Sequence, residues 1–255
     1  MNEEQLVYGR NPVIALLRER ARRADEVAVL SGAAGPLGEV VALARRAGVK
    51  VSYRTRDQLT AIAGSPHHQG VVARVASTEY VDLTALQQIP LERGEPAFFL
   101  ALDQVQDPRN LGALLRTADA FGVHGVIVPK HRQVGVTAAA ARTAMGAVES
   151  VPVTRETNLV GALETLKKSG VWVYGAVIEG GVPAWSADLS GHLCLVLGGE
   201  GEGLRPLVAR ACVVLLSVPM AGSVGSLNVS AAGAVLCYEV ARQRAAGGKR
   251  LDFST

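Results

Sequence analysis

The sequence is short of the residues that mark several familiar protein classes. Its 255 residues include only three cysteines, and aromatic residues make up 4% of the chain. Cys194, Cys212 and Cys237 lie far apart in apolar segments, without the CxxC spacing of metal sites or the dense pairing of secreted disulfide scaffolds. We therefore expect three buried free thiols.

Metal-binding and membrane-spanning patterns are also missing. The five histidines are scattered apart from His67-His68, and no HExxH motif or cluster of histidines and carboxylates occurs. No stretch of about 18 uncharged apolar residues has membrane-span character, and the start of the chain, NEEQLVYGRN, contains no apolar signal-peptide core. We expect a soluble, cytoplasmic protein with no metal site and no membrane partner.

The chain also lacks the fingerprints of dinucleotide and ATP sites. The glycine-rich segment GGEGEG at residues 198–203 never completes GxGxxG, because Leu204 and Pro206 stand where a further glycine is needed. A phosphate-binding loop would need Lys and Ser or Thr after Gly203, where this chain has Leu204-Arg205. An NAD or ATP site is therefore disfavoured.

Apolar strands and amphipathic helices alternate regularly in the second part of the chain. The composition, 49% hydrophobic and 19% charged, is sufficient for a substantial core. Nearly continuous apolar strands between helices indicate an α/β domain with a parallel sheet buried on both faces. We predict strands at 97–102, 125–128, 171–177, 193–197 and 213–217, and helices at 111–121, 137–145, 159–168, 204–209 and 227–243.

A smaller α/β unit precedes this domain. The pattern predicts helices at 11–23, 38–47 and 56–63, and strands at 26–30, 50–53 and 71–75. Residues 77–96 lack sustained periodicity and end in PLERGEP, so no regular element is expected there. The predicted organisation is a small domain at 1–78, a linker at 79–95, a large domain at 96–245 and a flexible tail at 246–255.

Positive charge is concentrated in the small unit. Residues 1–78 contain 11 Lys and Arg against 7 Asp and Glu, which leaves 15 against 16 for the rest of the chain. This asymmetry favours a polyanion-binding module, although arginines on solvated helix faces are common. The candidate phosphate contacts are Arg10, Arg18, Arg22, Arg23, Arg45 and Arg46. His67, His68 and Gln69 either contact the polyanion or only shape a turn.

Three polar turns follow strands of the large domain. Their sequences are DPRNLGALLRTADAFG from Asp107, LVLGGEGEGLRP from Leu195, and VPMAGSVGSLNVSAAGAVLCYE from Val218. Ligands of open α/β sheets collect outside the carboxyl ends of the strands, so we expect one shared site. For Asn110, Ser226 and Asn228, which stand near helix starts, ordinary helix capping is the alternative role.

In this order and spacing the three turns resemble the signature motifs of the SpoU (TrmH-type) RNA ribose 2′-O-methyltransferases of the SPOUT superfamily. The resemblance covers roughly residues 96–245. In the small domain, YGRNPVIALLRER and HHQGVVARV resemble the branch that methylates a guanosine of 23S ribosomal RNA. The resemblance implies a trefoil knot in the large domain, a ribosomal-protein-like (L30e-like) RNA-binding domain, a homodimer and S-adenosylmethionine as the cofactor. The general prior against knotted chains is overridden only by this resemblance.

The same resemblance implies roles for individual residues. The catalytic set would be Asn110, Arg116, Glu200, Ser226 and Asn228. The cofactor would be bound, largely through backbone atoms, by Leu197, Gly198, Gly199, Gly203, Val218, Met220, Ser226 and Leu227. RNA-binding candidates in the large domain are Arg109, Arg116, Arg142 and Arg205.

Two roles for Arg116 stay open. One makes it the general base that deprotonates the ribose 2′-hydroxyl, but a guanidinium is effectively always protonated. We favour a clamp on the phosphate beside the target ribose, which would also stabilise the developing negative charge on the 2′-oxygen.

Other functions stay open as well. The chain could be a transfer-RNA ribose methyltransferase, or an RNA-binding or ribosome-assembly factor that keeps the fold without the chemistry. The complete polar set favours an enzyme, because a binding protein has no need of it. Small residues in the last helix, Ala231, Ala232, Gly233 and Ala234, would allow close helix approach in a dimer whose sites are completed across the interface.

Overall fold

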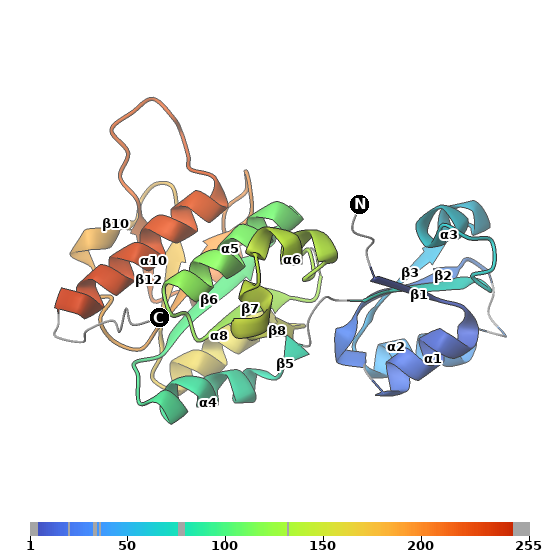
Figure 1. Cartoon of the computed structure of the whole chain (residues 1–255). Helices are drawn as coiled ribbons and strands as arrows, with labels where there is room; N and C mark the ends of the chain where they lie inside the picture. The colour runs from blue at the N-terminus through green and yellow to red at the C-terminus, as the bar shows by residue number, and fades with distance from the viewer. Residues whose placement is uncertain are drawn as a thin grey trace.

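The structure is a computed structural model that describes residues 5–19, 21–32, 35, 37–75, 80–131 and 133–246. Within these residues the chain forms two α/β units, each built on its own sheet (Figure 1). The predicted tail lies outside the described residues apart from Ala246, and so do residues 76–79 between the two units.

The small domain is a sheet of order β1-β4-β2-β3 with helices on both faces (Figure 1). Successive strand residues point to opposite faces, so Val27 and Val29 meet one layer and Ala28 the other. Helices α1 and α2 cover the first face, and α3 covers the second through Leu59. The elements are β1 (Gln5–Tyr8), α1 (Arg10–Glu19), a 3-10 turn at Ala21–Arg23, β2 (Ala24–Leu30), α2 (Gly38–Arg46), β3 (Lys50–Arg54), α3 (Arg56–Ala63) and β4 (Val71–Val75).

The large domain has three layers around a sheet of order β10-β12-β9-β11-β6-β7-β8-β5. Its strand pairings in the described chain are all parallel, which confirms the predicted α/β class with a parallel sheet. The strands are β5 (Tyr80–Val81), β6 (Phe98–Asp103), β7 (Gly125–Pro129), β8 (Val153–Glu156), β9 (Trp172–Ala176), β10 (Val182–Pro183), β11 (Leu193–Gly198) and β12 (Val214–Ser217).

The helices of this domain divide between the two faces of the sheet. One face is covered by α5 (Pro108–Ala120), α6 (Ala138–Ala144), α7 (Ala147–Ser150) and α10 (Val229–Ala246). The other face is covered by α4 (Leu83–Arg93), α8 (Leu159–Lys168) and α9 (Pro206–Ala211). Alternate residues of β6 serve the two cores, since Phe98 and Leu100 face α5 whereas Phe99 faces α8.

The expectation that residues 77–96 hold no regular element is wrong. Tyr80–Val81 pairs with β8, and Leu83–Arg93 forms α4, which places the fully buried Leu86 against Gly125. Pro90 lies in the last part of the helix, and Gly94 ends it with a left-handed φ of 63°. The Pro and Gly residues therefore mark the end of a helix, not the absence of one.

A polar cluster connects the two domains. Arg155 on β8 donates to the carboxylate of Asp25 at 2.8 Å, and to the carbonyl oxygens of Ala24 and Asp25. The hydroxyl of Tyr80 donates to the same carboxylate at 2.9 Å, and its ring lies 4.8 Å below the guanidinium. Burial raises the pKa of the Asp25 carboxyl, although Arg155 opposes that shift. Because a buried charge without its partner is costly, this ion pair favours one arrangement of the two domains.

The remaining expectations concern cysteines, membranes and metals. All three cysteines are free thiols; Cys194 and Cys237 are buried and Cys212 is half-buried. Burial raises the pKa of the Cys237 thiol to about 12. Within the described residues, no helix is long and apolar enough to cross a membrane, and no group of three metal-ligating side chains occurs.

Candidate functional site

A cavity of about 470 Å³ opens at the carboxyl ends of the large sheet. It is walled by the turn after β11, the segment after β12 and the first turns of α10. The eight residues predicted to bind the cofactor all line it: Leu197, Gly198, Gly199, Gly203, Val218, Met220, Ser226 and Leu227. The structure thus brings together residues that are up to 30 positions apart in the sequence, from 197 to 227.

The glycines of the turn after β11 are required by close backbone packing. A Cβ atom on Gly198 would collide with the backbone of Gly203, and one on Gly199 with the carbonyl oxygen of Gln104. Gly201 and Gly203 have left-handed φ values of 87° and 66°. The turn therefore presents main-chain donors and acceptors to the cavity where other residues would present side chains.

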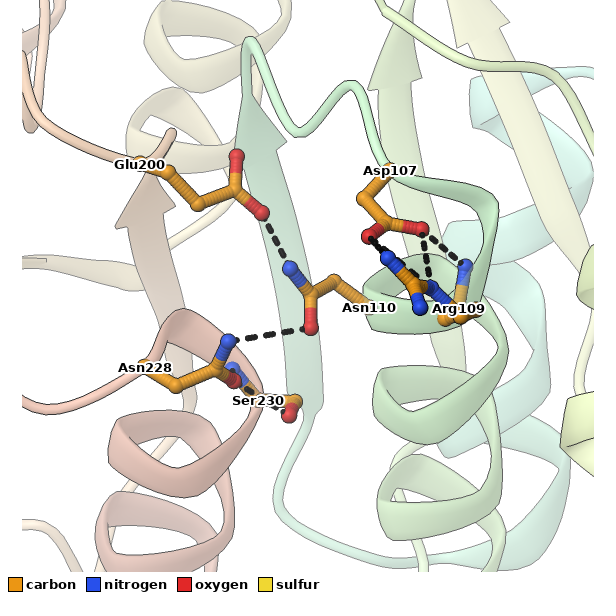
Figure 2. Close-up of polar contacts among 6 residues, drawn as sticks. All are labelled: Asp107, Arg109, Asn110, Glu200, Asn228 and Ser230. Carbon is orange, nitrogen blue, oxygen red and sulfur yellow. Dashed lines mark hydrogen bonds and ion pairs between the residues drawn. The ribbon is translucent and has the colours of Figure 1, made fainter.

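Three side chains from the three motifs form one hydrogen-bonded chain (Figure 2). The amide nitrogen of Asn110, in the first turn of α5, donates to the carboxylate of Glu200. Its amide oxygen accepts from Nδ2 of Asn228 at 3.2 Å. Because the carboxylate only accepts, the NH₂ group of Asn110 must face Glu200, and the orientation of the amide is determined. The turn after β6, the turn after β11 and the start of α10 are held together at this amide.

Helix capping was the alternative role for Asn110, Ser226 and Asn228, and the structure gives a different result for each. Asp107, not Asn110, caps α5 by accepting from the backbone N–H of Arg109 at 2.8 Å, so the capping role for Asn110 is wrong. Asn228 does cap α10, since its Oδ1 accepts from the backbone N–H of Ser230 at 2.9 Å while its Nδ2 binds Asn110. Ser226 lies before the helix start and lines the cavity.

Arg116 stands apart from this network within the single chain. It lies on the exposed part of α5, and it neither lines the cavity nor, unlike Asn110, bonds to residues that do. Its guanidinium instead donates to the sulfur of Met145 at 3.0 Å, at the C-terminal end of α6. One chain thus assembles four of the five predicted catalytic residues and leaves the fifth on the surface.

The arginines predicted to contact RNA have different surroundings. Arg205 is bound through Nε to the fully buried Asp103 at 2.7 Å, so it connects β6 with the start of α9. Arg109 pairs with Asp107 and holds the pKa of that carboxyl below its usual range. Arg10 and Arg18 both pair with Glu39, whereas Arg45, Arg46, Arg116 and Arg142 are exposed, Arg23 is half-buried, and the side chain of Arg22 lies outside the described residues.

Two of the three residues in the loop at 67–69 have contacts that shape the turn. His68 is buried, and its Nδ1 accepts from the backbone N–H of Gly70 at 3.0 Å. Gln69 adopts a φ of 52°, and its side chain accepts from the backbone N–H of Arg10. His67 is exposed.

Two features of the site were missed in the sequence. Asp103 ends the apolar run FFLALD, and this lone carboxylate at a strand end was the available signal for its pairing with Arg205. Val177 and Ile178, directly after β9, line the cavity as well. The available signal was their position at a strand end, directly before Glu179-Gly180-Gly181.

Comparison with known proteins shows the class. Residues 97–238 match the SpoU rRNA Methylase family, and residues 6–81 match the domain described as RNA 2′-O ribose methyltransferase substrate binding. The chain therefore belongs to the SpoU rRNA methylase family, and it is a methyltransferase.

Individual relatives indicate which methyltransferases of this family the chain resembles. The 23S rRNA (guanosine-2′-O-)-methyltransferase RlmB of Ralstonia nicotianae is 42% identical over 246 residues, which is 96% of this chain and 98% of the relative. Among solved structures, the SpoU methyltransferase AviRb from Streptomyces viridochromogenes, in complex with the cofactor AdoMet, aligns with a TM-score of 0.60 at 26% identity, covering 95% of this chain and 91% of that chain. The AdoMet-bound rRNA methyltransferase from Sinorhizobium meliloti aligns with a TM-score of 0.59 at 25% identity, covering 93% and 86%.

The cavity suits S-adenosylmethionine, the methyl donor of this family. Its walls combine apolar side chains such as Leu197 and Val218 with a glycine turn that lets backbone atoms approach a ligand. Glu200 and Glu202 also line it, and their carboxylates favour a cationic sulfonium over a pyrophosphate.

Replacing Gly198 with alanine should weaken binding of S-adenosylmethionine by at least about tenfold, because the new Cβ would displace the backbone of the turn. Isothermal titration calorimetry measures this affinity. Gly222→Ala is the matched control, since a Cβ there meets nothing within 4 Å. Wild-type affinity in Gly198→Ala would show that the turn does not contact the ligand.

Proposed function

We propose that this enzyme transfers the methyl group of S-adenosylmethionine to the ribose 2′-hydroxyl of a guanosine in 23S ribosomal RNA. The observation that carries the proposal is the cavity lined by the second and third motifs, to which the first motif is joined by the hydrogen bonds of Asn110 to Glu200 and Asn228. The choice of RNA is supported by 42% identity, over nearly the whole chain, to an enzyme named for that guanosine reaction.

The side chains of this site orient the ribose 2′-hydroxyl, which loses its proton during the reaction. When bound, S-adenosylmethionine supplies an electrophilic methyl group on its sulfonium. Asn110 is held rigidly between Glu200 and Asn228, so it can orient a ribose hydroxyl with little loss of side-chain freedom. A neutral hydroxyl is a poor nucleophile, and its proton leaves to solvent or to another group as the methyl group is transferred.

The reaction is tested by mapping 2′-O-methyl groups in RNA from cells with and without the gene. We expect a single guanosine of 23S ribosomal RNA to lose its methyl group, and purified enzyme to restore it in vitro. Loss of a transfer-RNA methyl group would instead support the transfer-RNA alternative. An unchanged methylation map would leave the role of an RNA-binding or assembly factor.

Arg116 is proposed to grip the phosphate beside the target ribose. A guanidinium presents a planar, permanently charged pair of donors that suits a phosphate and cannot readily accept a proton. In Arg116→Lys, single-turnover rates should fall about 10- to 100-fold while the pH–rate profile keeps every limb of the wild type. Disappearance of one ionisation limb would identify Arg116 as the base.

We further propose a homodimer in which the partner subunit's Arg116 completes each site. Two observations support it: Arg116 lies outside the cavity of its own chain, and apolar side chains of α10 and of the segment before it are exposed, among them Tyr238 at 58% and Val224 at 66%. The small residues of α10 are not all available for a dimer contact, since Gly233 packs against Leu114 of the same chain. The exposed surface of α10 includes Ala231, Val235 and Tyr238.

Mixed dimers test the shared site directly. At limiting S-adenosylmethionine, Arg116→Ala chains and Gly198→Ala chains should each have strongly reduced activity alone, because one lacks the clamp and the other binds the cofactor weakly. In a mixed dimer, one site combines an intact cofactor cavity with an intact arginine, so activity should return on mixing and re-association. No recovery, despite mixed dimers detected by mass spectrometry, would place both residues in a site within one chain.

Three finer features complete the proposal. The segment from β12 to α10 is proposed to form the trefoil knot, which is supported by its passage beside the turn after β11 to line the same cavity. The small domain is proposed to be L30e-like, in keeping with its mixed sheet between two helical layers. We place the enzyme in the cytoplasm, where ribosomal RNA would be its substrate.

A further inference from the structure

A second cavity, of about 150 Å³, lies between the two domains. Asp25, Glu26 and Lys50 line it from the small domain, and Lys130, Gln133 and Arg155 from the large domain. Lys130 directly follows β7, and Arg155 lies near the end of β8. Both strands lie on the side of the large domain that faces the small one (Figure 1). The cavity is thus at the same carboxyl edge of the sheet as the cofactor site.

The charges around this cavity favour an anion. Four cationic side chains, Lys50, Arg74, Lys130 and Arg155, face two carboxylates, Asp25 and Glu26, which leaves a net charge of +2. Arg155 is paired with Asp25 at 2.8 Å, and Lys50 with Glu26 at 3.5 Å. Both carboxylates are therefore already bound to cations.

Lys130 is the cation best placed to bind a ligand. It extends from the large domain to the small domain, where its Nζ atom lies beside Gly48. Within the part of the chain that the structure describes, no carboxylate pairs with it. The ammonium group thus stands at the boundary of the two domains with its charge unmatched by a neighbour.

Gln133 adds a fixed hydrogen-bond donor. Its Oε1 accepts from the backbone N–H of Val105 at 2.7 Å, which determines the orientation of the side-chain amide. The Nε2 atom is consequently directed elsewhere, and among the residues that the structure describes it is buried without a partner. The described residues offer Nε2 no hydrogen-bond acceptor at this wall of the cavity, and a buried donor without an acceptor is unfavourable. A ligand with both oxygen acceptors and negative charge would satisfy Gln133 and Lys130 together.

We propose that this interdomain cavity binds a backbone phosphate of the RNA substrate, through the ammonium group of Lys130 and the side-chain amide of Gln133. The identity of the anion as RNA rests on the proposed function.

Helix α6 leads from this cavity to the arginine proposed to grip the target phosphate. Thr137, at its N-terminus, lines the cavity, and Met145, at its other end, contacts Arg116. Eight residues of helical rise span about 12 Å, and Arg142 is exposed along the way. An RNA strand bound by the small domain would pass the cavity before it reaches Arg116.

Salt-dependent RNA binding by the full-length enzyme tests the proposal. Binding to a 23S ribosomal RNA transcript would be measured by filter binding over a series of salt concentrations. Lys130→Gln should lower affinity about 3- to 10-fold and reduce the steepness of the log–log salt dependence by roughly one phosphate contact. Gln133→Glu keeps the acceptor for Val105 but directs negative charge at the phosphate, so it should weaken binding at least as much.

Two further variants control for charge and folding. Lys168→Gln removes the same charge from α8, on the opposite face of the large sheet, and should leave binding unchanged. Lys130→Arg keeps the cation and should retain wild-type affinity, which separates loss of charge from damage to the fold. Unchanged affinity and salt dependence in both Lys130→Gln and Gln133→Glu would overturn the proposal.

Inorganic phosphate distinguishes RNA from a small free anion. Its effect on the melting temperature would be compared in wild type and Lys130→Gln. If Lys130→Gln abolishes stabilisation by phosphate but binds RNA like the wild type, the cavity serves a free anion and the proposal is wrong. Weakened RNA binding in the variants, together with no methyl transfer by the wild type, would support the cavity site and refute the proposed reaction instead.

Discussion

The side-chain amide of Asn110 is the contact on which the site depends. It is the point at which the turn after β6, the turn after β11 and the start of α10 meet, and both of its polar ends are used. Because the carboxylate of Glu200 can only accept, the amide has one favourable orientation, and that orientation aligns the oxygen with Asn228. Three segments that are separated by roughly 90 and 28 positions thereby acquire one fixed geometry.

Close packing makes this meeting of segments possible. A Cβ at Gly112 would collide with the backbone of α6, and a Cβ at Gly233 would lie 2.5 Å from a methyl group of Leu114. Helices α6, α5 and α10 therefore pack at short range on one face of the sheet, with α5 between the other two. The missing side chain at Gly198 likewise lets the backbone of Gly203 pack against it, in the turn that lines the cavity. Stability and function thus draw on the same small residues.

Local pattern predicted the elements well where local signals decide them. Helix α3 was predicted at its observed bounds, because Thr55 and Gln58 form a capping box and Gly64 ends the helix in a left-handed conformation. Helix α4 is hard to predict for the opposite reason: Pro90 and Gly94 are residues that break helices, but here they act only at the end of the segment. Its formation depends on Leu86, whose burial against Gly125 is a tertiary contact.

The site could be predicted as a set of residues but not as an arrangement. The motifs named the residues around the cavity, since parallel strands place their carboxyl ends at one edge of the sheet. They did not show that Arg116 would lie outside the cavity of its own chain, because the packing of α5 against the rest of the domain decides which of its residues border the cavity. The contact between Asp25 and Arg155 was equally invisible, since 130 residues separate the pair and neither belongs to a motif.

A double-mutant cycle between Asn110 and Glu200 tests the central claim most directly. Asn110→Ala, Glu200→Ala and the double variant would be compared with the wild type in single-turnover methyl transfer to RNA. If the two side chains act as one unit, the double variant should be little worse than the more damaged single variant, with a coupling energy above about 1 kcal/mol. Strictly additive losses would contradict the account, because they would mean that each side chain acts without the other.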